Sequence, residues 1–331
     1  MTNFKKIGLT ALAGSLIATS AMAGSLSVSG GAKLSYTTKG GSGDTNNAAN
    51  PFGFQQAMTF SGGGELDNGH SVSLTHVMTA EGAQSSSLLT YDMGDMGSIM
   101  YTDKAGGLGI AGIDDLTPTA GEEIFDGLAN AAAGSSTGVA MAVAGYASQP
   151  ATGFEYTNSS VDGLKLEVGY SKNSAATAED DGAVVASGAI KSSSSIAIQY
   201  TGVEGANIYF GTGSKGVSAT TEVDMTTMGV KYAVGAFTAG VQVTDLDPAT
   251  GNDIETTQVG VSFAVNDDLS ISYGQATTEK SGAVDQELSG FAIGYSMGGL
   301  TLTAHSNKGG NLDNTAANDT EHTELTVSFA F

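Results

Sequence analysis

Leu325-Thr-Val-Ser-Phe-Ala-Phe331, the last seven residues of the chain, decide the fold. Apolar residues alternate strictly with small or polar ones, so Leu325, Val327, Phe329 and Phe331 share one face of an extended segment. Such alternation is typical of a strand between two unlike environments. The ends of soluble domains usually fray into water. The segment therefore favours a strand whose apolar face meets something other than water, although an edge strand of a β-sandwich would alternate in the same way.

The same alternation recurs along the chain in units of strand, short turn, strand and longer polar loop. Asp67-Asn68-Gly69 and Asp162-Gly163 separate alternating runs and are typical of tight hairpin turns. Counted in this way, residues 24–331 hold about sixteen strands, each long enough for the roughly ten tilted residues that cross a bilayer. No linker or change of composition divides this region, which predicts a single domain.

The N-terminal segment, residues 1–23, has the layout of a secretory signal peptide. Lys5 and Lys6 precede an apolar run over residues 7–18, and Ala21-Met22-Ala23 provides a cleavage site of small residues. No later stretch reaches the roughly 18 consecutive apolar residues that a membrane helix needs. Without such a helix, a chain can span a membrane only as a closed barrel. The sequence thus predicts an all-β fold, a transmembrane antiparallel β-barrel.

Composition and charge exclude several classes of protein. The chain has no cysteine, so disulfide scaffolds and thiolate metal sites are excluded. It has 34 acidic residues, 12 lysines and no arginine. Binding to nucleic acid depends on neutralising phosphates with basic residues, so nucleic acid is not an expected partner. A surface this acidic is compatible with small cations as partners.

The longest stretch without alternation covers residues 103–152 and breaks the regular pattern. Long loops of this kind are usually functional or disordered. Six carboxylates lie in it against one base, Lys104, together with apolar residues such as Ile110, Ile113, Ile124 and Phe125. Because these apolar residues need a surface to pack on, we expect the loop to fold into the barrel and narrow its lumen. The carboxylates are Asp103, Asp114, Asp115, Glu122, Glu123 and Asp126.

Several segments resemble the trimeric general porins of Gram-negative bacteria, particularly those of α-proteobacteria. They are Gly94-Asp95-Met96-Gly97-Ser98, Asp114-Asp115-Leu116, Phe154-Glu155-Tyr156-Thr157-Asn158, Val161-Asp162-Gly163-Leu164 and the terminal Phe331. The resemblance implies a sixteen-stranded barrel that assembles as a homotrimer in the outer membrane. It also implies that the outer-membrane assembly machinery reads the alternating C-terminal strand with its final aromatic residue, and that loop carboxylates face basic residues across a constriction.

The chain departs from this pattern in its basic residues, because that wall is usually rich in arginine. Alternation places Lys33, Lys165 and Lys231 on the lumen side of their strands, where they would form a thinner basic wall; the alternative is that they lie near a wet rim. Lysine is a flexible point charge, so carboxylates should dominate the constriction. Rings of acidic side chains favour cations. We therefore expect passive diffusion of small hydrophilic solutes and ions, with a preference for cations.

No cofactor is expected, with one open possibility. A calcium ion could bridge paired loop acids, Asp114 with Asp115 or Glu122 with Glu123. Calcium needs six to eight oxygen ligands, and neighbours in sequence do not by themselves converge on one ion. The metal ligands are therefore left unassigned.

Other functions remain as alternatives. A solute-specific channel or a plugged, structural or adhesive surface barrel would use the same strands. An enzyme is not expected, since the sequence contains no nucleophile elbow between strand and helix. It also contains no HExxH zinc pattern and no phosphate-cradling loop.

Overall fold

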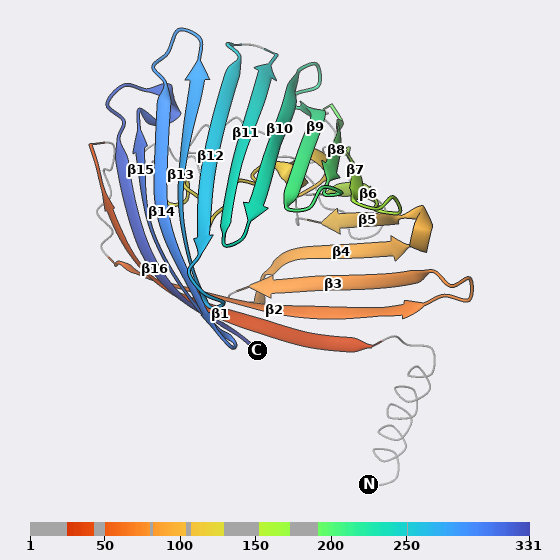
Figure 1. The fold of residues 1–331 in the computed structure, drawn as a ribbon. Helices are drawn as coiled ribbons and strands as arrows, with labels where there is room; N and C mark the ends of the chain where they lie inside the picture. The colour runs from red at the N-terminus through yellow and green to blue at the C-terminus, as the bar shows by residue number, and fades with distance from the viewer. Residues whose placement is uncertain are drawn as a thin grey trace, which may run out of the picture.

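Sixteen antiparallel strands close into one barrel in the computed structural model (Figure 1). The structure describes residues 25–42, 50–79, 82–103, 107–128, 152–172, 191–249 and 251–331. The predicted signal peptide, residues 1–23, and Lys104 lie outside these ranges. Each strand pairs with its neighbours in sequence, and the first strand pairs with the last. The predicted all-β barrel of about sixteen strands is confirmed.

The strands are β1 (Leu26–Gly40), β2 (Phe52–Glu65), β3 (Ser71–Thr79), β4 (Gln84–Asp92), β5 (Ser98–Asp103), β6 (Gly153–Asn158), β7 (Leu164–Ser171), β8 (Ser193–Tyr200), β9 (Ala206–Gly216), β10 (Glu222–Val234), β11 (Phe237–Pro248), β12 (Ile254–Ala264), β13 (Leu269–Lys280), β14 (Gln286–Met297), β15 (Leu300–Gly310) and β16 (Thr320–Ala330). Short 3-10 helices are η2 (Gly94–Met96), η3 (Gly109–Ile113) and η5 (Leu312–Asn314). Within the described ranges, no helix is both long and apolar enough to cross a bilayer.

The two faces of the wall are chemically opposite to those of a soluble protein. On β12, the inward-facing Thr256 and Gln258 are each 1% exposed, whereas the outward-facing Val259 and Val261 are 43% and 50% exposed. The same order of polar inside and apolar outside recurs on the neighbouring strands. Soluble monomers rarely expose so large a contiguous apolar surface. A transmembrane barrel requires an apolar outer band, because that band contacts the lipid.

The terminal segment is a strand, as its alternation predicts, and this strand closes the barrel. β16 pairs with β1 from Gly31 opposite Ala330 to Gly40 opposite Glu321. Beyond the last ladder pair, Gly30 and Phe331 exchange two backbone hydrogen bonds of 2.7 and 2.9 Å. A Cβ atom on Gly30 would lie 2.8 Å from the ring of Phe331, so a side chain there would require this exposed ring to move. The backbone thus stays paired up to the final residue.

The two rims and the height of the wall differ around the barrel. One rim has short turns, such as residues 66–70 between β2 and β3, and the other carries the longer connections. β5 and β6 have only six residues each, compared with thirteen in β10. The wall is therefore lowest around β5 and β6, next to the point where the long loop leaves the barrel wall.

Candidate functional site: the loop inside the barrel

The connection from β5 to β6 folds back into the barrel, as the sequence predicts. We use the name constriction loop for its described part, residues 107–128 (Figure 1, the yellow segment inside the wall). Its first turn, η3, packs against the inner faces of β7, β8 and β9. The loop then continues along the inner wall as far as β15 and β16.

Two apolar clusters attach the constriction loop to the wall. In the first, Ile110 and Ile113 pack against inward-facing residues that include Tyr209 and Met225. In the second, Ile124 and Leu128 pack against residues of β13, β14 and η5 that include Leu288. Ile110, Ile113 and Leu128 are fully buried. The apolar residues that the sequence places in this loop are therefore its anchors.

Polar side chains of the wall bind the backbone of the constriction loop between and around these clusters. Gln242 of β11 accepts a hydrogen bond from the Leu116 N–H at 3.1 Å, and its Nε2 donates to the Ile113 and Asp114 carbonyls at 3.1 and 2.7 Å. Further hydrogen bonds hold both ends of the constriction loop. They also pair backbone groups that would be costly to bury without a partner. They are Gly109 N–H to Glu155 Oε2, Ile110 N–H to Ser195 Oγ, Ala120 N–H to Ser272 Oγ, and Asn307 Nδ2 to the Glu123 and Asp126 carbonyls.

One pair of opposite charges forms between the constriction loop and the wall. Lys33 Nζ on β1 lies 2.8 Å from Glu122 Oε1 and 3.6 Å from Glu324 Oε1 on β16. The Lys33 and Glu122 side chains remain about a third exposed, at 31% and 34%. An ion pair this accessible contributes only about 1 kcal/mol or less to stability. Its larger consequence is that Glu122 has a counter-charge beside it.

The other two predicted lysines also occupy inward-facing positions. Lys165 Nζ lies 2.7 Å from Glu167 Oε1 on the same strand, β7, so its charge is largely compensated there. Lys231 stands on β10 opposite Asn207 and Gly240. The three lysines are thus on separate parts of the wall, and β2 to β5 contain no lysine. They do not gather into one basic patch.

Five of the six predicted carboxylates lie on the constriction loop, and all five are half-buried. Asp115 Oδ1 accepts hydrogen bonds from Thr117 and from Gln258 Nε2 of β12. Asp126 Oδ2 accepts one from the Glu123 N–H at 2.8 Å. Asp103 is separate: it shares the outward-facing side of β5 with Ile99 and Tyr101 and bonds Gln84 and Thr152.

Crowding and burial change the ionisation of these carboxylates. Burial, reinforced by Asp115, raises the pKa of Glu123 to about 9. Burial and the neighbouring Asp115 charge raise the pKa of Asp114 to about 6. Burial also raises the pKa of Asp126. The hydrogen bond from Lys33 holds the pKa of Glu122 below its usual range. At neutral pH, therefore, Glu123 is protonated and the net charge of the group is still negative.

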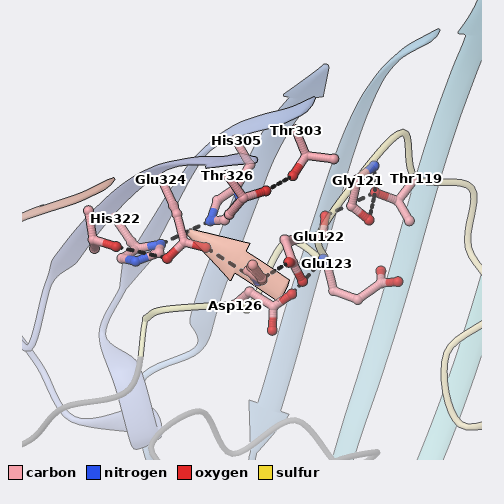
Figure 2. Close-up of polar contacts among 12 residues, drawn as sticks. Thr119, Gly121, Glu122, Glu123, Asp126, Thr303, His305, His322, Glu324 and Thr326 are labelled. Atoms are coloured by element: carbon pink, nitrogen blue, oxygen red, sulfur yellow. Dashed lines mark hydrogen bonds and ion pairs between the residues drawn. The ribbon is translucent and has the colours of Figure 1, made fainter. Parts of the chain in front are cut away.

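A histidine pair beside this group was not predicted from the sequence. His305 Nε2 of β15 lies 3.0 Å from His322 Nδ1 of β16, and both residues are 4% exposed. Figure 2 shows them next to Glu324, with Glu122, Glu123 and Asp126 of the loop nearby. A Cβ on Gly127 would lie 2.1 Å from the His322 ring, so the loop lies directly against the pair. Strand alternation gives their inward direction, but only the register brings the two rings together.

No group of three or more His, Cys, Asp or Glu residues in the described ranges has the arrangement of a metal site. The calcium ion considered for the paired loop acids stays a prediction.

Comparison with known proteins decides the family. The model of a family described as Gram-negative porin matches residues 8–305. The chain belongs to the Gram-negative porin family. Together with the closed barrel, this membership places the protein in the outer membrane and makes it a channel for passive diffusion rather than an enzyme. No relative was found among curated protein sequences.

Solved structures agree on the fold. The anion-selective porin from Comamonas acidovorans matches with a TM-score of 0.65 and 11% identity over 93% of this chain and 99% of that chain. OmpT of Vibrio cholerae matches with a TM-score of 0.63 and 11% identity over 93% and 98% of the two chains. A variant of the Rh. blastica porin matches with a TM-score of 0.65 and 14% identity over 93% and 100%. At such identities the likeness concerns the fold alone.

Proposed function

We propose that this porin is a water-filled channel for small hydrophilic solutes that prefers cations. The observation that carries the proposal is the path of the constriction loop, which is bound to one side of the inner wall along its described length. Its carboxylates then border the lumen, and the strands β2 to β5 add no lysine to it. Acidic side chains favour cations, and low-dielectric walls focus their field.

The fold by itself carries no information on ionic preference. One structural neighbour is described as anion-selective, and its fold matches 93% of the length of this chain. Selectivity must therefore come from the side chains at the constriction. After protonation of Glu123, the charges there are Asp114, Asp115, Glu122 and Asp126, and Lys33 forms an ion pair with Glu122. This balance supports cation preference at neutral pH.

We further propose that the protein is a homotrimer whose low wall is covered by the neighbouring copies. A transmembrane strand needs about 9–11 residues, so the six residues of β5 and of β6 are too few to line the hydrocarbon layer alone. Backbone outside a strand is not tolerated in contact with lipid. The outer side of this wall is nevertheless apolar, with Ile99, Tyr101 and Phe154 at 41%, 40% and 51% exposure. A second copy would satisfy both requirements.

Liposome swelling tests the diffusion function. Vesicles containing the purified protein are diluted into isotonic solutions of uncharged sugars of increasing size, with protein-free vesicles as the control. An open channel admits the smaller sugars at rates that fall smoothly with size. A solute-specific channel would admit one sugar out of order, and a plugged surface barrel would admit none, so either result rejects the proposal.

A further inference from the structure

Four glycines form a straight row across the inner wall beneath the constriction loop. Gly240 on β11 is paired with Gly260 on β12, Gly260 with Gly274 on β13, and Gly274 with Gly290 on β14. All four occupy inward-facing positions, in strands whose other inward-facing residues include buried glutamines and threonines. Because none of the four residues carries a side chain, the row is a shallow groove in the inner wall.

The constriction loop lies in this row at van der Waals contact. A Cβ on Gly240 would lie 2.8 Å from Pro118 Cδ, and one on Gly260 would lie 3.0 Å from the Pro118 carbonyl oxygen. Cβ atoms on Gly274 and Gly290 would lie 2.8 and 2.9 Å from Ile124 Cγ2. Real Cβ atoms essentially never make contacts below 3.0 Å. At three of the four positions even alanine would force the loop or the wall to shift.

The loop has little freedom to shift sideways. Gln242, Gln258 and Ser272, on β11, β12 and β13, hold its residues 113–120 by hydrogen bonds on the same strands that carry the glycines. Beyond the row, Asn307 of β15 holds the carbonyls of residues 123 and 126. Packed interiors do not absorb extra atoms without displacement. The direction left for a displaced loop is away from the wall, into the lumen.

We propose that the glycine row, Gly240, Gly260, Gly274 and Gly290, sets the width of the channel by fixing how closely the constriction loop lies to the wall. These glycines are positioning residues: none of them needs to touch a passing solute. The proposal rests on the diffusion function proposed above. Side chains at these positions would move the loop carboxylates toward the channel axis and lower the size limit for solutes.

Single-channel conductance of Gly274→Ala tests the proposal, with Gly62→Ala as the matched control. A Cβ on Gly62 meets nothing closer than 3.8 Å, so this change adds the same methyl group to a strand glycine without a clash. We expect a measurable fall in conductance, together with a lower sugar-size limit in liposome swelling, for Gly274→Ala alone. Gly274→Val should lower both further.

A compensating substitution distinguishes an effect on channel width from an effect on folding. Ile124→Ala removes the Cγ2 atom that the new methyl group would meet, so the double variant Gly274→Ala with Ile124→Ala should return to the conductance of Ile124→Ala alone. This comparison remains possible if Gly274→Ala by itself fails to fold. Conductance of Gly274→Ala that equals or exceeds that of Gly62→Ala, or no compensation in the double variant, overturns the glycine proposal. If the unmodified protein does not conduct, the diffusion function itself fails.

Discussion

At the scale of single residues, the constriction combines charges of unequal strength. Lys33 holds the pKa of Glu122 below its usual range, whereas burial, reinforced by neighbouring carboxylates, raises the pKa of Glu123 to about 9 and keeps it protonated at neutral pH. A count of acids in the loop therefore overstates its charge. The residues that determine selectivity are those that are ionised and not fully compensated.

Removing Lys33 should increase cation preference. In Lys33→Gln, Glu122 and Glu324 lose the ammonium group that lies 2.8 and 3.6 Å away, so the negative potential in the lumen rises. Lys308→Gln is the control, because Lys308 forms an equally short pair, 2.8 Å from Glu321, on the outward-facing side of the wall. Reversal potentials in a salt gradient compare them. Equal shifts in both variants would show that total charge, and not the lumen charge, is responsible.

Cation preference should also rise with pH. Asp114, with a pKa raised to about 6 by burial and Asp115, is mainly protonated at about pH 5 and mainly ionised at about pH 7.5. The lumen thus gains negative charge over that interval, and Asp126, whose pKa is also raised by burial, acts in the same direction. Reversal potentials measured at both pH values check this, and Asp114→Asn should show a smaller change. A preference that falls on raising the pH contradicts the assignment.

At the scale of elements, β16 and the constriction loop show how much could be predicted. Alternation of Leu325, Val327, Phe329 and Phe331 correctly indicates a strand with one apolar face, since a period of two depends on local sequence alone. The loop's inward fold follows from apolar residues such as Ile124. The contact between His305 and His322, and the alignment of the glycine row, depend on strand register, which a single sequence does not determine.

The terminal residue should be needed for assembly more than for the stability of the finished barrel. Phe331 is 77% exposed and contacts Gly30 at the closing seam, and we propose that the assembly machinery reads it together with Leu325, Val327 and Phe329. Phe331→Ala should reduce the folded yield in the outer membrane several-fold, as measured by heat-modifiable mobility. Phe237→Ala, which removes another outward-facing aromatic residue with 60% exposure, serves as the control. Equal yields for the two variants would remove the special role of the terminus.

At the scale of the whole molecule, the barrel inverts the usual arrangement of a soluble fold. Buried threonines and glutamines line the inside, and valine, phenylalanine and tyrosine cover the outside. The wall is also uneven in height, because β5 and β6 are much shorter than strands such as β10. Membrane residence follows from the first property, and the proposed trimer follows from the second.

A charged substitution on the outer side of the low wall should dissociate the trimer. Ile99→Arg places a cation on the outer side of β5, where we expect neighbouring copies to meet, so trimers should dissociate in mild detergent. Val259→Arg places the same charge on the tall wall of β12, where it faces lipid. It should lower the stability of the folded barrel by about 2–4 kcal/mol without changing the oligomeric state. Cross-linking and sedimentation distinguish the two. Trimers that survive Ile99→Arg would exclude β5 from the interface.

Cation-preferring diffusion is tested most directly by the current through single molecules in a planar bilayer under a KCl gradient. We predict discrete conductance steps and a reversal potential of the sign set by potassium, because loop carboxylates border an open lumen. A silent barrel, or a reversal potential set by chloride, would contradict it.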